Sequence, residues 1–258
     1  MKYIYLTFLS IRDNTTSKAE IFLSLLRPSM ILLVQYILFK ALYQSSQQNI
    51  GGFTFNEIIS YILLSGFVFP FTDTGYLPHE MEDMTLSGKF TGIYSMPINF
   101  FLYLLSTSIG KNVTRFLPFL FLNIMLQPFL NNTIQTSRIP LFLILLSLAF
   151  LSNFALYFII SSLLFSKKRI NGITEMFRFF YDTASGRLFP LSFLPGGIGT
   201  ILTFSPFAIS VYLPLKFIMG KLYTTTEILL ALFYPVMLCM LAIRLFNKEI
   251  KKYEAFGG

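Results

Sequence analysis

The stretch from Asp182 to Gly220 constrains the fold of this chain more than any other. It is apolar almost throughout, yet it contains four prolines and five glycines. Proline removes a backbone hydrogen-bond donor and clashes with the preceding turn, so the stretch cannot form one straight membrane helix. It is also too hydrophobic for a solvated loop. We therefore expect short broken helices over about 185–220 that enter a membrane and turn back, sheltered by other helices or lining a cavity.

The composition indicates an integral membrane protein. Of the 258 residues, 54% are hydrophobic, 12% are charged and 31 are phenylalanine. A soluble domain carries about 25% charged residues. The net charge of +8 can also indicate nucleic-acid binding, but here most of it follows the excess of basic residues that membrane proteins carry on their cytoplasmic side. We therefore expect membrane lipid, and no nucleic acid, as a partner.

Hydropathy predicts an all-α integral membrane fold with six transmembrane helices in one domain, residues 1–258. An interfacial helix is expected at about 1–19, because Lys2, Arg12 and Lys18 stand among apolar side chains there; the alternative is an ordinary tail. No internal repeat divides the chain. The predicted spans are residues 21–43, 56–76, 98–130, 140–165, 170–184 and 226–246. The re-entrant segment at 185–220 lies between the last two of them.

Basic residues orient the predicted spans. Six crossings put both termini on one side, and twelve lysines and arginines then lie on that side against five on the other. The five are Lys40, Arg138, Arg187, Lys216 and Lys221. The excess predicts that both termini are cytoplasmic, in the plasma membrane of a bacterial cell, with the broken segment at the outer face.

The most polar region runs from Leu77 to Pro97 and is predicted to be cytoplasmic. It contains several acidic residues and His79, the one histidine of the chain. Met84 and Leu86 lie three and five residues after Met81, and Phe90 lies four after Leu86. These four apolar residues would form one face of a short helix. The region is either a solvated loop or a docking helix for a partner. Its mixture of charges with methionines and Phe90 favours docking.

Charged residues also fall inside predicted spans. Lys111 and Arg115 lie four apart on one helix face, which predicts that this face points to an interface, a headgroup layer or the protein interior. Glu175, Arg178 and Asp182 share one face of the predicted span at 170–184. Either they pair with one another, or they mark a translocation path or a proton relay.

Soluble catalytic motifs are absent from the sequence. It has no GxxxxGK[ST] phosphate loop, which argues against ATP hydrolysis by this chain itself. It has no HExxH or CxxC motif, and one histidine and one cysteine argue against a zinc site. We expect no catalytic residue, no metal site and no cofactor in this chain.

Three segments resemble the membrane subunits of type-2 ABC exporters, the ABC-2 permease family. Residues 87–97 (SGKFTGIYSMP) resemble that family's "G-x-hydrophobic … R-P" segment, with Met96 in place of the usual basic residue. The long third helix with basic residues midway is similar. Residues 185–195 (SGRLFPLSFLP), followed by Ser205-Pro206-Phe207, resemble its "SG…PL-x-F-x-P … PF" pattern.

This resemblance implies a six-helix permease encoded separately from its ATPase. Two such subunits, identical or related, would assemble with two ATP-binding subunits that hold ATP and magnesium. The resemblance and the charge pattern together place ATPase coupling at Glu80, Glu82, Met84, Leu86 and Phe90. They place the path and its outer gate at Arg178, Asp182, Phe189, Phe193 and Phe207.

Two other function classes compete with this one. A proton-coupled secondary transporter would use Glu175 and Asp182, but the chain lacks the second repeat half typical of such carriers. An intramembrane enzyme would need a clustered nucleophile and base, or metal ligands, and the sequence offers neither. The phenylalanine-rich outer segment suits a hydrophobic or amphipathic substrate, such as a peptide, a lipid or a drug.

Overall fold

The computed structural model describes residues 2–13, 18–45, 49–126, 135–167 and 170–253, and within these ranges the chain is helical. The described part contains no strand, only an isolated bridge between Ile50 and Phe53. The all-α prediction is therefore confirmed for it. The α-helices are α1 Lys2–Asp13, α2 Lys18–Ser45, α3 Phe55–Thr72, α4 Leu77–Leu86, α5 Lys89–Tyr94, α6 Phe100–Leu126, α7 Ile139–Ser162, α8 Asn171–Ala184, α9 Ile198–Thr203, α10 Tyr212–Ile218 and α11 Thr225–Glu249. The 3₁₀ turns are η2 Thr136–Arg138, η3 Leu163–Phe165, η4 Leu191–Phe193, η5 Ala208–Ser210 and η6 Ile250–Lys252.

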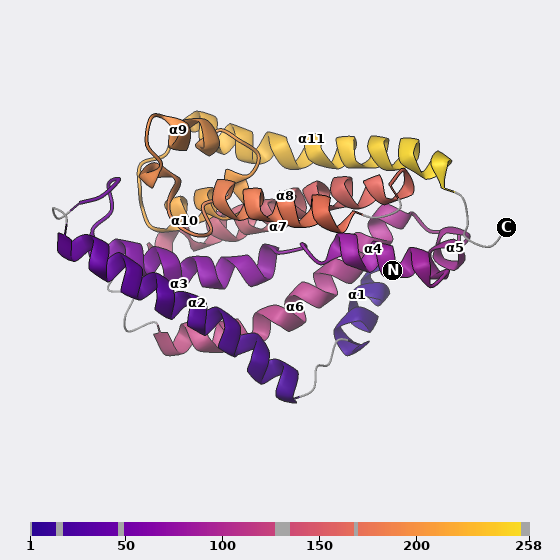
Figure 1. Ribbon diagram of the computed structural model, residues 1–258, viewed down its shortest axis with the longest axis horizontal. Coiled ribbons are helices and arrows are strands. Elements are labelled where there is room, and N and C mark those ends of the chain that lie inside the picture. Colours follow the sequence, from indigo (N-terminus) through magenta and orange to yellow (C-terminus); the bar gives the residue numbers. More distant parts are fainter. Residues whose placement is uncertain (1, 14–17, 46–48, 127–134, 168–169, 254–258) are drawn as a thin grey trace.

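The long helices run roughly along the longest axis of the molecule. In Figure 1, α9 and α10 lie at the left end, whereas α5 and the C-terminal end of α11 lie at the right, with α1 near them. Helix α7 is central and packs against α11, α3, α4 and α10. It is apolar around its whole circumference and buried on most sides, as expected for a helix enclosed by others.

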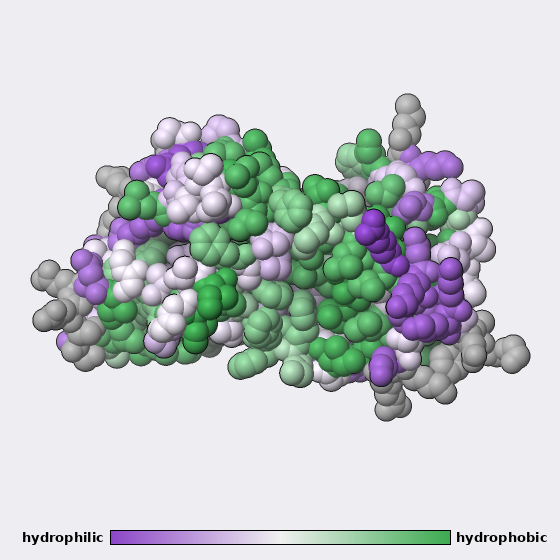
Figure 2. Space-filling model, turned by 90° about the horizontal axis from the view of Figure 1, so that it is seen from above, coloured by the Kyte–Doolittle hydropathy of each residue, from purple (hydrophilic) through white to green (hydrophobic). Residues whose placement is uncertain are grey.

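Among the described residues, three helical stretches are long and apolar enough to cross a membrane: residues 55–86, 139–165 and 225–252. Figure 2 shows the corresponding pattern on one face, where hydrophobic residues occupy the middle and hydrophilic ones gather toward the ends, most densely at the right. These observations support a membrane protein. Helix α8 has 14 residues and measures about 21 Å, less than the ~30 Å hydrocarbon core. It does not cross alone, so the six-span count stays a prediction.

The second predicted span, 56–76, is broken between two helices. Pro70 lies inside α3, and the helix ends at Thr72, four residues before α4 begins. The end of a helix leaves carbonyl groups without partners. Here the side-chain amide of Asn112 on α6 donates to the carbonyls of Phe71 and Asp73, at 2.8 and 2.9 Å. Helix α6 therefore supplies hydrogen-bond donors to carbonyl groups at the break.

Helix α1 packs on α6 through small and hydroxyl residues. Thr7 and Ser10 donate hydrogen bonds to carbonyls of α6, and a Cβ atom on Gly110 would lie 2.6 Å from the carbonyl oxygen of Thr7. The opposite face leaves Ile4, Tyr5 and Phe8 exposed. An apolar exposed face beside charged residues fits the predicted interfacial helix, whose position at a membrane surface stays a prediction.

Two hydrophobic clusters fill the interior. One lies at the left end of Figure 1 and joins α3, α7, α10 and the segment that precedes α10. The other lies at the right end and joins α4, α5, α6, α7 and α11 through many phenylalanine rings. Each end of the molecule therefore has its own packed core, and each core supports one of the two regions described next.

Candidate functional site

The broken segment, residues 185–220, consists of four short helical pieces joined by turns. The pieces η4, α9, η5 and α10 have three to seven residues each. This confirms the broken helical character that the prolines and glycines predicted. That the segment enters and leaves a membrane from one side remains a prediction.

The first turn of the broken segment, residues 185–188, is fully hydrogen-bonded from outside. Its four consecutive carbonyl groups accept hydrogen bonds from the amide of Tyr212, the hydroxyls of Tyr61 and Ser65, and the amide of Gln35, at 3.0, 2.5, 3.5 and 3.1 Å. Non-helical backbone at membrane depth is tolerated only where protein groups satisfy it. Helices α2 and α3 therefore supply what this turn requires.

Gly186 is required at that turn for two reasons. Its φ is +77°, a left-handed conformation that side chains disfavour. A Cβ atom would also lie 2.9 Å from the Cβ of Tyr212 and 3.0 Å from the hydroxyl of Tyr61. Glycine thus permits the close approach that the hydrogen bond from Tyr61 needs.

The predicted gate phenylalanines are divided between the two clusters. Phe193 packs edge-on against Phe39 and Phe53, with ring centres 5.9 and 6.1 Å apart, and Phe189 joins the same cluster. Phe207 instead packs against α8, with its ring centre 5.2 Å from that of Phe180. The three rings therefore do not form one plug in this conformation.

The predicted mutual pairing of the α8 charges is wrong, because each acid has a partner elsewhere. Asp182 accepts two hydrogen bonds from Arg187, at 2.9 and 3.0 Å. The Oε1 atom of Glu175 lies 3.5 Å from the Nε2 atom of His79 on α4. Arg178 is partly buried and forms no ion pair with any described residue. The pattern within α8 could not indicate these partners, which come from beyond the helix.

Helix α8 carries an exposed apolar face that the charge pattern did not reveal. Met176 and Phe179 are 79% and 78% exposed, and Ile173 and Phe180 lie beside them. The opposite face is buried through Tyr181, whose hydroxyl accepts a hydrogen bond from Asn153 at 2.5 Å. The spacing of the apolar residues along 173–180 was the signal for this face.

At the other end of the molecule, Glu80 points inward. It forms an ion pair with Lys111 of α6, and both side chains are largely buried. The guanidinium of Arg115 lies 4.2 Å from the centre of the Tyr76 ring. Of the three environments predicted for this face, Lys111 therefore occupies the protein interior, whereas Arg115 is an exposed residue that lies against the Tyr76 ring. Glu80 is not free for contact with a partner.

The prediction that the apolar residues from Met81 to Phe90 share one face of a single helix is also wrong. Helix α4 ends at Leu86, and Gly88, with a φ of +72°, separates it from α5. Met81 is buried, Met84 is partly buried against the aromatic cluster, and Leu86 is 69% exposed. Glu82 is partly buried on α4.

Phe90 is the one buried side chain of α5. Its ring centre lies 5.1 Å from that of Phe100 on α6, 5.0 Å from that of Phe165 after α7, and 5.1 Å from that of Tyr253 after α11. The outer side of α5 is open, with Tyr94 and Met96 about half exposed. We call the surface of residues 86–97 the tip. Phe90 therefore joins the tip to the start of α6 and to the turns that follow α7 and α11.

The comparison with known families agrees with this arrangement. The family described as ABC-2 family transporter protein matches residues 29–257, which include every helix from α3 to α11. The chain belongs to the ABC-2 family of transporter proteins. No curated protein matches it. This ABC-2 permease is therefore the membrane component of an ABC transporter, a class of membrane subunit that works with an ATP-binding partner. The resemblance read from residues 87–97 and 185–207 is confirmed at the level of the family.

Proposed function

We propose that this ABC-2 permease is the transmembrane subunit of an ATP-driven exporter that moves a hydrophobic or amphipathic substrate, such as a peptide, a lipid or a drug, out of the cytoplasm. The observation that carries the proposal is the position of Phe90, which ties the exposed tip to α6, α7 and α11. A force applied to the tip reaches α6 and the ends of α7 and α11 through Phe90, and Tyr94 adds contacts to Phe100 and Phe246.

The orientation follows from charge. The tip, α1 and the C-terminal end of α11 lie at one end of the molecule, and the broken segment lies at the other. The C-terminal end of α11, which carries Arg244 and Lys248, and η6, which carries Lys251 and Lys252, lie near the tip end. The positive-inside tendency supports a cytoplasmic tip and cytoplasmic termini in a plasma membrane. The broken segment then faces outward and closes the outer end of the path.

The tip is the proposed docking surface for an ATP-binding subunit, which would hold the ATP and magnesium. ATP binding shifts a conformational equilibrium only through contacts that differ between states. Leu86 offers an apolar contact at the tip and Glu82 an acidic one on α4 beside it. Phe90 and Met84 transmit displacement into the aromatic cluster. Glu80 contributes by joining α4 to α6.

The proposed path runs beside the exposed face of α8. Met176 and Phe179 present apolar surface there, and the partly buried Arg178 and Asp182 add polar groups along the same helix. Charged side chains at membrane depth face protein or water rather than lipid. A second permease subunit, identical or related, would cover this face. Phe189, Phe193 and Phe207 then belong to the outer closure.

Gentle affinity purification from host membranes tests the proposal. We expect an ATP-binding subunit in equal amount with ATP hydrolysis in the sample, and the number of different permease chains distinguishes a homodimer from a heterodimer. A chain that is purified alone, without nucleotide hydrolysis, contradicts the proposal. It would favour the alternative, a proton-coupled carrier, for which the pair of titratable groups Glu175 and His79 is the supporting observation.

A further inference from the structure

Two lysines of the broken segment and its exit loop bind two helix N-termini. Helix α10 carries Lys216, and Lys221 follows α10. Each lysine forms an ion pair with a glutamate in the first turn of a long helix, Glu227 of α11 and Glu57 of α3. These contacts lie at the end of the molecule opposite the tip.

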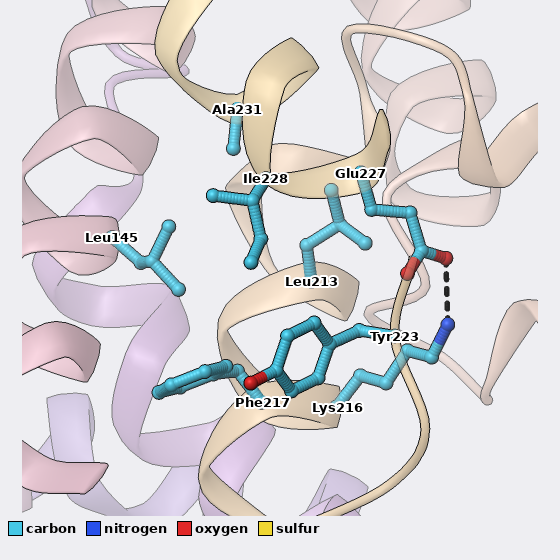
Figure 3. Close-up of a pocket in the computed structure, with 8 residues that line it drawn as sticks. All are labelled: Leu145, Leu213, Lys216, Phe217, Tyr223, Glu227, Ile228 and Ala231. Carbon is cyan, nitrogen blue, oxygen red and sulfur yellow. Dashed lines mark hydrogen bonds and ion pairs between the residues drawn. The ribbon is translucent and has the colours of Figure 1, made fainter. Parts of the chain in front are cut away.

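The first pair lies over a small cavity between α7, α10 and α11. The Nζ atom of Lys216 is 2.6 Å from Oε1 of Glu227, and the two side chains are 16% and 5% exposed. Figure 3 shows this pair beside apolar residues that line the cavity, among them Leu145, Leu213 and Ala231. The ion pair of Lys216 and Glu227 therefore joins α10 to α11 at the edge of this small, mainly apolar cavity.

The second pair joins the loop after α10 to α3. The Nζ atom of Lys221 is 2.6 Å from Oε1 of Glu57, donates to the carbonyl of Gly52 at 2.9 Å, and lies 4.7 Å from the centre of the Phe53 ring. The two side chains are 23% and 30% exposed. Phe53 also packs against Phe193, so this contact reaches the first part of the broken segment.

Both glutamates have a second role that does not depend on the lysines. Each belongs to a capping box, in which its Oε2 atom accepts a hydrogen bond from the amide of the N-cap residue, Thr54 or Thr224. The carboxylate also lies at the positive end of the helix dipole. If a lysine leaves, the glutamate keeps its cap and its favourable field. The two ion pairs can therefore open without leaving an unsatisfied acid.

We propose that Lys216 and Lys221 form a releasable latch that holds α10 against α11 and α3, and that the latch opens during the transport cycle. The inference rests on the proposed function, in which the broken segment closes the outer end of the path. The latch consists of one largely buried and one partly exposed ion pair, and both favour one position of the segment. When α10 moves away, water enters and can replace each lost partner. The latch residues act by positioning the segment and need not touch the substrate.

A buried reporter measures opening of the latch without knowledge of the substrate. Ala231 is 1% exposed and lines the cavity below Lys216, so a cysteine there reacts with an external reagent only when α10 moves away. We would use Ala231→Cys with Cys239→Ser, in right-side-out vesicles that also contain the ATP-binding subunit. The probe is a membrane-impermeant maleimide.

We expect slow labelling at rest and labelling about tenfold faster after Lys216→Met or Lys221→Met, since loss of one ion pair raises the open population. Glu227→Gln should also accelerate labelling, because glutamine keeps the capping box and lacks the charge. Lys216→Arg should restore slow labelling. The matched control is Thr224→Val, which removes the cap hydroxyl and keeps both ion pairs. ATP with vanadate should accelerate labelling of the parent chain.

The latch is overturned if labelling stays slow in both lysine variants, or if Thr224→Val accelerates it equally, which would indicate general loosening. Labelling that does not respond to ATP and vanadate, in vesicles that hydrolyse ATP, overturns opening during the cycle. Failure of the proposed function looks different. In that case no ATP-binding subunit accompanies the chain, whereas the lysine variants still label faster than the parent.

Discussion

The hydroxyl of Tyr61 donates a hydrogen bond of 2.5 Å to the main-chain carbonyl of Gly186, and both groups are buried. This bond joins α3 to the turn at which α8 gives way to the broken segment. The chain there is neither helix nor strand, so its carbonyl groups depend on side chains for partners. The position of the broken segment therefore depends on specific residues of α3 as well as on its own sequence.

Replacement of Tyr61 by phenylalanine should destabilise the protein. The ring still fills its site, but the carbonyl of Gly186 loses its partner in a buried position, which costs about 1–3 kcal/mol. Thermal unfolding in detergent should show the lower stability. Tyr36→Phe is the matched control, because the Tyr36 side chain is 42% exposed and no described residue is hydrogen-bonded to its hydroxyl. Equal melting temperatures for the two variants would contradict this account.

Replacement of Asn112 by leucine should destabilise the break between α3 and α4. The side chain keeps its approximate volume but no longer donates to the carbonyls of Phe71 and Asp73. Two orphaned carbonyls cost roughly 2–6 kcal/mol at the usual value per group. Asn247→Leu, on the exposed surface of α11, should change stability by no more than about 0.5 kcal/mol. Denaturant or thermal unfolding of both variants checks the difference.

Leu86 and Phe90 should separate binding at the tip from transmission. Leu86→Asp changes an exposed side chain, so it should leave stability nearly unchanged and reduce the amount of ATP-binding subunit that co-purifies. Phe90→Leu opens space in the aromatic cluster and costs about 1–2 kcal/mol. It should retain the partner and lower the ATP-dependent labelling described above. A variant of Phe90 that loses its partner while Leu86→Asp keeps it would reverse the two roles.

The ion pair of Glu80 and Lys111 should matter for folding more than for docking. Removing one partner of a largely buried pair costs about 3 kcal/mol, because the other charge stays buried. Glu80→Gln should therefore lower the melting temperature clearly, whereas Glu82→Gln should lower it little. The double variant Glu80→Lys with Lys111→Glu should recover part of the loss. A double variant no more stable than Glu80→Lys alone would show that the pair contributes nothing.

Much of the architecture could be predicted from local patterns. Prolines 190, 195, 206 and 214 remove helix donors at short intervals, and short helices are what the chain forms there. The spacing of Lys111 and Arg115 placed both on one face. Their partners, Glu80 and Tyr76, lie on another helix, and no pattern within α6 identifies them. Local periodicity thus indicates which side of a helix is polar, but not what meets it.

The wrong predictions share this cause. Arg178 lies between two acids on α8, which favoured local pairing, yet Asp182 is bound by Arg187, just beyond the end of the helix. Phe90 was assigned to the helix of Met81, because the spacing fits, but Gly88 turns the chain between them. That glycine was a readable signal. The two lysine contacts of the latch, by contrast, could be identified only from the structure. Lys216 and Glu227 are 11 positions apart in the sequence, and Lys221 and Glu57 are 164 positions apart.

Neutralising Glu175 and Asp182 should distinguish an ATP-driven exporter from a proton-coupled carrier. Glu175 is 63% exposed beside His79, so Glu175→Gln should alter neither stability nor ATP hydrolysis by the complex. Asp182→Asn leaves the Arg187 guanidinium, 3.2 Å from the centre of the Phe69 ring, without its carboxylate, and should lower the melting temperature. A proton carrier requires at least one of these acids to release and take up protons in each cycle. Proton movement into proteoliposomes, followed with an internal pH-sensitive dye, therefore distinguishes the two functions. Proton uptake by the parent chain that both substitutions abolish would contradict the ATP-driven proposal. The absence of proton uptake, with ATP hydrolysis unaffected by Glu175→Gln, would support it.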